Sequence, residues 1–476
     1  MMAKNNLVTT GAPGAIRQAL CFFCILLSAA ANAQTDLQQL VYQRQYATAL
    51  EEVLPLHGED STDMKTMYAV GQAYEGLLRY REAYGCYRHC LSLGEDGRID
   101  LLNAVARMAF NIGMTREAED CYLQALVIDS TDFYANHQLA RLYFQSEEYT
   151  DAIHYYNLLL KLYPNHPVLL RGMGDCYSRM NFLPVAAAYY RMFFDSNTES
   201  VAAASTLVNT LLMINQTEDA VSVCDTALVY NPGDQTLYRH KGMALFTARQ
   251  YEAADSVYAY LLEQGDSSYM TIKYSAFSRY YTGKYMDAIN LFETAYRMDT
   301  TAVDVSLYFG STLGRTYDRR RAYRLLDHAE VMMQPNPALV SLLTQFRGET
   351  YARDGRPDQA AAMFYDLWEK AGRAEMLEHI RSLYVYDSSN IAAIKDENRR
   401  SRALFIYTLI ASEYDNIGKS RKSLMHHVRA QLQTFQEEMF MEGKTEFPML
   451  SPDGRKSVLS IAGLQELILR LPESPE

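Results

Sequence analysis

An alanine recurs along most of this chain at a nearly constant spacing. Ten alanines follow one another at gaps of 34 or 35 residues, except for a last gap of 38. Such a period is typical of stacked structural units, and a chain of 476 residues is too long for one compact core. The sequence therefore predicts an elongated array. The repeated alanines are Ala49, Ala83, Ala118, Ala152, Ala186, Ala220, Ala254, Ala288, Ala322 and Ala360.

Each alanine has regular neighbours on both sides. Apolar positions at intervals of three and four residues lie on one face of a helix, so every unit predicts two helices. Small residues allow two helices to cross closely, and large rings fill the wedge between neighbouring pairs. Twelve positions before the alanine stand Gly71, Ala106, Ala140, Gly174, Gly242, Ala276, Gly310 and Gly348, with Val208 as the exception. Four positions after it stand Tyr87, Tyr122, Tyr156, Tyr190, Cys224, Tyr258, Phe292, Leu326 and Phe364.

This order of small, aromatic, alanine, aromatic and small residues resembles the tetratricopeptide repeat. Pro164 and Pro232 stand at the position where that repeat often closes, and Pro335 stands one residue beyond it. The resemblance covers roughly residues 37–370. It implies an all-α fold, a right-handed superhelical solenoid of about ten helix pairs, and an array domain over residues 34–370.

The first 33 residues have the features of a secretory signal peptide. Lys4 and Arg17 precede an apolar run over 19–31, and Ala31-Asn32-Ala33 supplies small residues for cleavage before Gln34. We expect an exported protein in the periplasm or associated with the cell envelope, with an uncleaved anchor as the alternative. No later segment is apolar enough to predict a membrane span. The five cysteines that follow are an odd number scattered through predicted helices, which favours apolar packing over a disulfide framework.

Charge and motifs narrow the classes of function. Acids outnumber bases by 57 to 45, and the net charge of −12 argues against a nucleic-acid partner, which needs a basic surface. No catalytic motif is complete: the segment Gly418-Lys419-Ser420 lacks the glycine that a phosphate-binding loop requires five residues earlier. We therefore predict no enzyme activity, no cofactor and no metal site.

The segment 371–476 departs from the repeat pattern. It predicts a helix over 376–385, a long helical stretch over 401–441 that imitates one degenerate repeat through Ala411, Tyr414 and Gly418, and a loop over 443–455. A final apolar stripe predicts a helix that caps the end of the array. The alternative is a helix that lies in the groove until a partner displaces it. The stripe consists of Ile461, Leu464, Ile468 and Leu471.

The resemblance implies where a ligand would bind. In tetratricopeptide proteins the first helix of each pair lines a concave groove, and the positions fifteen and eleven before the alanine face the ligand. Five of these eighteen positions are Lys or Arg and two are acidic. Basic residues therefore outnumber acidic ones in the groove, whereas acidic residues outnumber basic ones in the chain as a whole. The predicted binding residues are Tyr68, Gln72, Asn103, Arg107, His137, Arg141, Arg171, Asn209, Arg239, Lys273 and Phe277. The remaining positions hold Asp175, Ser205, Met243, Leu307, Ser311, Gln345 and Glu349.

These features predict a non-catalytic scaffold that holds a peptide or a partner helix, with acidic groups on the partner. Arginines suit this task because they bind carboxylates in a bidentate manner. A solvated groove with internal ion pairs, such as Arg171 with Asp175 one turn away, would have the same sequence. Two further alternatives are a structural subunit of an envelope assembly, acting through the convex face or the C-terminal extension, and an enzyme with its site in residues 371–476.

Overall fold

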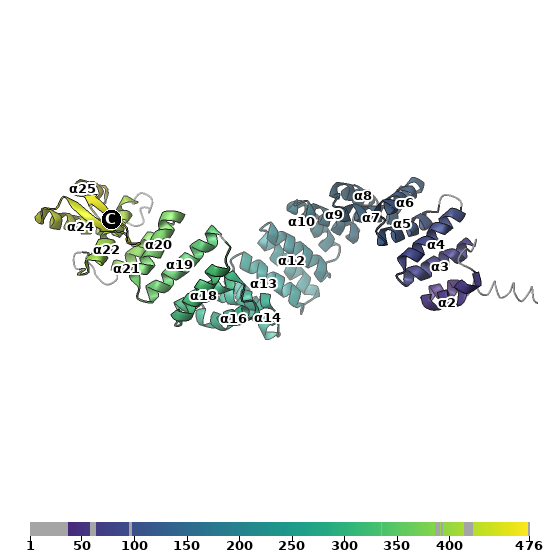
Figure 1. Cartoon of the computed structure of the whole chain (residues 1–476), viewed down its shortest axis with the longest axis horizontal. Helices are drawn as coiled ribbons and strands as arrows, with labels where there is room; N and C mark the ends of the chain where they lie inside the picture. Colours follow the sequence, from purple (N-terminus) through teal and green to yellow (C-terminus); the bar gives the residue numbers. More distant parts are fainter. Residues whose placement is uncertain are drawn as a thin grey trace, which may run out of the picture. The chain divides into compact units, whose positions relative to one another are not determined.

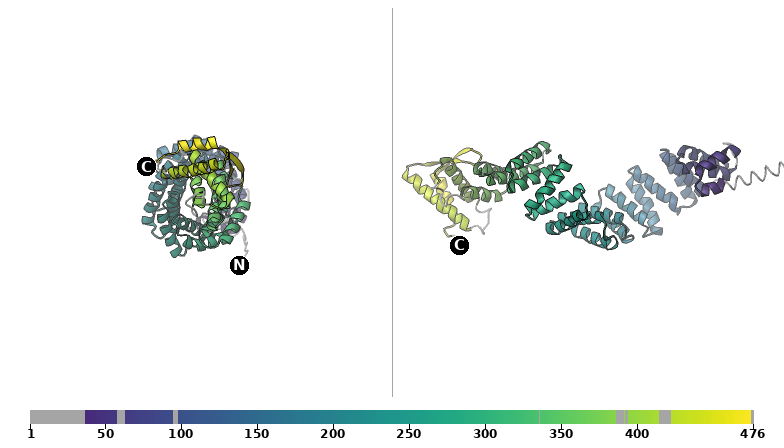
Figure 2. Two further views of the ribbon diagram at one scale, coloured as in Figure 1. Left: turned by 90° about the vertical axis from the view of Figure 1, so that its left-hand side faces the viewer. Right: turned by 90° about the horizontal axis from the view of Figure 1, so that it is seen from below.

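The computed structural model describes residues 37–57, 63–94, 98–334, 336–385, 391, 394–413 and 422–474. Within these residues the fold is almost entirely helical and consists of consecutive helix pairs (Figures 1 and 2). The chain divides into two compact units, residues 1–214 and residues 215–476, which are described separately below. The predicted signal peptide and Pro335 lie outside the described residues.

The first unit begins with a helical segment at residues 37–42 and continues through ten labelled helices. Pairs α3/α4, α5/α6, α7/α8 and α9/α10 pack as hairpins, and each hairpin also packs against the next. The bounds are α2 Tyr46–His57, α3 Met64–Gly76, α4 Tyr80–Leu93, α5 Ile99–Asn111, α6 Thr115–Ile128, α7 Phe133–Gln145, α8 Tyr149–Leu162, α9 Pro167–Arg179, α10 Leu183–Asp195 and α11 Val201–Met213.

Local sequence signals set where these helices start and turn. The side chains of Asp132 and Ser200 accept hydrogen bonds from backbone N–H groups in the first turns of α7 and α11, which satisfies donors that a helix leaves free. Between the two helices of a pair, one residue adopts a positive φ and reverses the chain. Its φ is 84° at Gly113 and 62° at Asn181, residue types that tolerate this conformation.

The predicted role of the repeat residues is confirmed. All ten repeated alanines are fully buried, with 0% exposure. A Cβ atom added to Gly71 would lie 2.7 Å from the ring of Tyr87, and one added to Gly174 would lie 2.5 Å from the ring of Tyr190. The small residue of the first helix therefore leaves the space that the aromatic ring of the second helix fills.

The second unit continues the same hairpins. Pairs α13/α14, α15/α16, α17/α18 and α19/α20 pack together, and the first helices α13, α15, α17 and α19 also pack directly against one another. This contact buries groove positions that the sequence placed on the surface, including Leu307 and Ser311. The bounds are α12 Thr217–Tyr230, α13 Gln235–Thr247, α14 Tyr251–Glu263, α15 Tyr269–Tyr281, α16 Tyr285–Met298, α17 Val303–Arg315, α18 Arg319–Met332, α19 Pro337–Arg353 and α20 Pro357–Ala371.

The C-terminal part of this unit contains the only strands among the described residues. An antiparallel hairpin pairs Phe447 with Leu459 and Met449 with Ser457, and it lies beside α25 (Figure 1). The loop predicted over 443–455 is therefore wrong at 446–450, because Phe447 and Met449 alternate with exposed residues and bury one face of a strand, and it is present at 451–455 as the turn between the strands. The bounds are α21 Glu375–Val385, α22 Glu397–Ser412, α24 Lys422–Met441, β1 Glu446–Leu450, β2 Lys456–Ser460 and α25 Ile461–Arg470.

The helices predicted in this part are largely present. The helix predicted over 376–385 is confirmed as α21, and the stripe predicted at the C-terminus forms α25, whose Leu464 and Ile468 are buried against α22 and α24. The stretch predicted over 401–441 is described as two helices, α22 and α24. Tyr414 and Gly418 of the degenerate repeat lie outside the described residues. No helix in the described ranges is long and apolar enough to span a membrane.

Candidate functional site

A depression of about 460 Å³ lies between the first helices of two successive repeats in the first unit. It brings together three of the predicted binding residues, His137 and Arg141 from α7 and Arg171 from α9. Tyr156 from α8 also lines it. We call this surface the α7–α9 groove. Its lining residues are His137, Arg141, Phe144, Gln145, Tyr156, Val168, Arg171, Gly172 and Asp175.

The two arginines of the α7–α9 groove differ in their partners: Arg141 has no ion pair among the described residues, whereas Arg171 forms a loose ion pair with Asp175, the internal pair that the sequence offered as an alternative. Arg141 is exposed, and its hydrogen bond is to the side-chain oxygen of Gln138, at 3.2 Å. The Arg171 side chain is 60% exposed, and its Nε lies 3.8 Å from Asp175, beyond hydrogen-bond distance. Both guanidinium groups therefore keep donors for a ligand.

Burial shifts the pKa values of Asp175 and His137, which also line the groove. Burial raises the pKa of Asp175, against the opposing effects of a hydrogen bond from Tyr190 and of nearby Arg171. Burial also lowers the pKa of His137, and Arg141 lowers it further. His137 is therefore neutral near pH 7, and the arginines supply the positive charge.

Apolar surface lies beside these charges. Val168 is 50% exposed at the rim, and Phe144 is partly buried within the groove. The ring of His137 stacks on Phe133 at a centroid distance of 5.8 Å, which fixes its position. The groove thus combines exposed guanidinium groups with an apolar wall, a composition suited to a peptide that carries both carboxylates and apolar side chains.

The other predicted residues of the first unit are placed differently. Tyr68 and Gln72 line a separate depression of about 810 Å³ near the start of the described chain. Arg107 lies close by, but its Nε is 2.7 Å from a carboxylate oxygen of Glu75. Asn103 is 8% exposed and donates to Asp132. Asn209 is exposed on α11 and lines neither depression.

In the second unit the predicted basic residues are occupied within the fold. Arg239 lies 2.9 Å from Asp266, and Lys273 lies 2.6 Å from Asp304 on the next repeat. Phe277 is 4% exposed because it packs against other aromatic rings where α15 and α17 meet, so its ring is not available to a ligand. These contacts correspond to the alternative of internal ion pairs.

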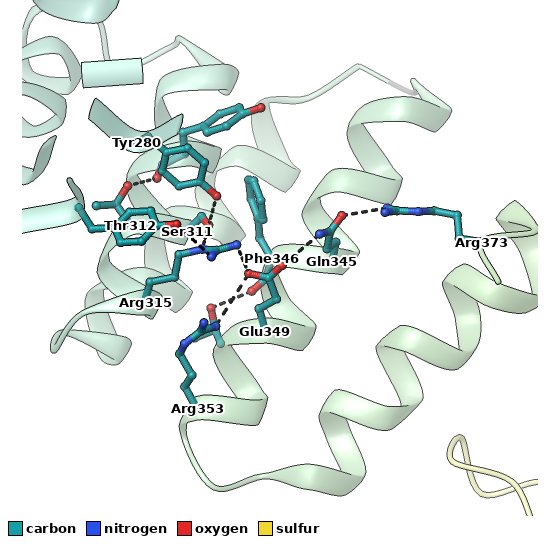
Figure 3. A network of polar contacts seen from close by, with 12 residues as sticks. Tyr280, Ser311, Thr312, Arg315, Gln345, Phe346, Glu349, Arg353 and Arg373 are labelled. Carbon is teal, nitrogen blue, oxygen red and sulfur yellow. Dashed lines mark hydrogen bonds and ion pairs between the residues drawn. The ribbon is translucent and has the colours of Figure 1, made fainter. Parts of the chain in front are cut away.

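Glu349 and Gln345, two further groove positions, belong to a polar network in the second unit (Figure 3). Arg315 of α17 donates to Glu349 of α19, and the amide of Gln345 donates to the same carboxylate at 3.0 Å. Arg373 donates to Gln345 at 2.8 Å. The network ties successive repeats together and leaves these positions saturated with internal partners.

The ion pair between Arg239 and Asp266 predicts how the stability of the fold changes in acid. Burial alone would raise the pKa of Asp266, but hydrogen bonds from Ser268, Thr271 and Arg239 outweigh it and lower the pKa to about 2, below the ordinary value of 3.8. Stability from this group is full above pH 3.8 and is lost as the pH falls toward 2, because the unfolded chain takes up the proton first. Asp266→Asn should lower the free energy of unfolding by about 2 kcal/mol at neutral pH.

The pH dependence of that difference is the measurement. Urea unfolding of wild type and Asp266→Asn, followed by circular dichroism, should show the difference shrinking as the pH falls from about 4 to about 2. A difference that stays constant over this range would mean that the carboxylate does not carry the effect.

The sequence interpretation missed part of the groove. Phe144 stands eight positions before the repeated alanine, and Glu75 occupies the same position in an earlier repeat, where it lines the other depression. Residues spaced by four and three share one helix face, so His137, Arg141 and Phe144 form a single row. This spacing could have identified Phe144 as a groove residue from the sequence. In the described part of the chain no three His, Cys, Asp or Glu side chains gather as a metal site.

Comparison with known proteins agrees with this geometry. The family model of the tetratricopeptide repeat matches residues 133–166, which contain α7 and α8. No match to the sequence was found among curated proteins. The segment 133–166 is therefore similar to the tetratricopeptide repeat, and the 34-residue period and the helix pairing extend the same arrangement to its neighbours.

Solved structures with similarity to the chain include two that are described as tetratricopeptide-repeat proteins. One from Parabacteroides merdae is 16% identical, covering 61% of this chain and all of that one, with a TM-score of 0.32. PilF of Pseudomonas aeruginosa is 16% identical over 46% of this chain and 99% of that one, with a TM-score of 0.35. YrrB, described as having an unusual peptide-binding site, is 17% identical over 39% and 94%, with a TM-score of 0.33. Scores this low support no argument about function.

Proposed function

We propose that this chain is an exported, non-catalytic scaffold that holds an acidic, partly apolar segment of a partner protein in the α7–α9 groove. One observation carries the proposal. Arg141 and Arg171 are exposed over a shared depression, Arg141 without an ion pair among the described residues and Arg171 with only a loose contact of 3.8 Å to Asp175, whereas the other predicted cations, Arg107, Arg239 and Lys273, have carboxylate partners at 2.6 to 2.9 Å.

The physical basis is charge-assisted hydrogen bonding at a site prepared for it. A guanidinium group binds a carboxylate through two parallel N–H donors, and such bonds are stronger than neutral ones. The chain as a whole carries a charge of −12, so acidic ligands are repelled on average, and the exposed arginines of this groove offset that repulsion locally. Phe144 and Val168 would add apolar contact, which gives affinity that salt does not weaken.

The location in the cell envelope is part of the same proposal. It rests on the charged, apolar and small-residue pattern of residues 1–33. Export would expose the groove to envelope proteins.

A labelled acidic peptide tests the binding. We expect a peptide of alternating Glu and Leu to bind the full chain, and to bind at least about tenfold more tightly than the same peptide with Lys in place of Glu. Fluorescence anisotropy at low and high salt measures this, and salt should weaken the acidic peptide only. Equal affinity for both peptides would contradict an arginine-based site.

A further inference from the structure

The end of helix α24 exposes two large apolar side chains next to each other. Phe440 is 80% exposed and Met441 is 85% exposed. Together with Gln436, Glu437 and Ile461 they line a depression of about 470 Å³, which we call the α24 surface. Neighbouring apolar side chains with this exposure are a mark of interaction sites, because isolated soluble proteins keep such patches small.

The fold does not need these two side chains. Met439, the residue before Phe440, is 3% exposed and belongs to the core, and Phe435 lies against Phe447 of β1 at a centroid distance of 4.1 Å. The inner face of α24 is thus already packed. Phe440 and Met441 lie on the face that the described residues leave uncovered.

The surroundings of the α24 surface are acidic. Glu437, Glu442 and Glu446 are exposed here, and Lys444, which pairs with Glu442 at 2.6 Å, is the one basic residue between positions 436 and 446. The last turn of α24 contains no basic residue, although the negative end of the helix dipole favours one there. Arg400 of α22 pairs with Glu438 and also acts on Glu442, so the carboxylates that remain for a positively charged partner are those of Glu437 and Glu446, which have no ion pair among the described residues.

We propose that the α24 surface binds a segment of another protein that presents apolar side chains flanked by Lys or Arg. The apolar groups cover Phe440 and Met441, and the cations meet Glu437 and the end of the helix. A second copy of this chain fits poorly, because a symmetric contact would place each acidic patch opposite itself. This surface carries charge opposite to that of the α7–α9 groove, so the two select different partners.

The test uses the full chain and a labelled helical peptide with a leucine face flanked by lysines. We expect this peptide to bind at least about tenfold more tightly than a matched peptide with glutamates in place of the lysines. The variant F440S/M441S should lose about tenfold in affinity for the lysine peptide and none for the acidic peptide of the α7–α9 groove. A matched control, V331S/M286S, removes two exposed apolar side chains elsewhere and should leave affinity unchanged.

Three outcomes would overturn this proposal. The first is equal affinity for the lysine and glutamate peptides, and the second is unchanged affinity in F440S/M441S with its melting temperature preserved. The third is a wild-type dimer in sedimentation that F440S/M441S dissociates, since the occupant would then be a second copy. None of these outcomes bears on the arginines of the first unit.

Discussion

Replacing Gly174 with alanine is expected to lower the free energy of unfolding by about 2 kcal/mol. A Cβ atom at this position would lie 2.5 Å from the ring of Tyr190, closer than packed atoms approach. The ring cannot easily move away, because it is 4% exposed and its hydroxyl donates to Asp175 at 2.7 Å. The substitution therefore forces apart the two helices of one repeat.

Gly85→Ala is the matched control for this experiment. Gly85 lies in the interior of α4, and a Cβ atom there meets nothing within 4 Å. Because glycine is a poor helix former, this change should raise the free energy of unfolding by about 0.5 to 1 kcal/mol. Urea denaturation of both variants measures the contrast. If Gly174→Ala and Gly85→Ala shift the urea midpoint in the same direction, the close approach of Gly174 to the ring of Tyr190 does not determine the stability of this helix pair.

Reversing both arginines of the α7–α9 groove should weaken binding of the acidic peptide by about 30-fold, or about 2 kcal/mol. The double variant R141E/R171E replaces two donors with two carboxylates that repel the ligand. Both side chains are exposed, and Arg141 has no ion pair to lose, so the fold should tolerate the change. Anisotropy titration with the acidic peptide measures the effect.

The control variant R116E/K161E changes the net charge by the same amount. Arg116 and Lys161 are exposed on the second helices α6 and α8 and do not line the groove. Its affinity should fall no more than about threefold, through long-range repulsion that salt screens. A similar loss in both double variants would mean that the peptide responds to overall charge and not to a site.

The periodic part of the fold was predictable because it depends on contacts inside one repeat. Gly174 and Tyr190 lie in adjacent helices of one hairpin, so their spacing in sequence repeats along the chain. The same regularity placed His137 and Arg141 on one helix face. The hairpin of β1 and β2 was missed because Pro448 and Gly454 signal a loop, whereas the alternation that makes a strand spans only five residues.

The sequence could not predict which charged groove residues form internal ion pairs, because their partners lie on neighbouring repeats. Arg107 pairs with Glu75, 32 residues earlier, and Lys273 pairs with Asp304, 31 residues later. The repeat pattern does not indicate which side chains pair with a residue of a neighbouring repeat. The burial of Phe277 likewise depends on direct packing of α15 against α17.

The most direct test of the central claim is site-specific photocrosslinking in the cells that make the protein. A photoreactive residue at position 145, in place of Gln145 at the α7–α9 groove, should crosslink to a partner protein, and the acidic peptide should compete. A probe in place of Asn157, exposed on α8 outside the groove, should give little of that product. Equal crosslinking from the two positions, or a product that R141E/R171E leaves unchanged, would contradict the claim that this groove holds the partner.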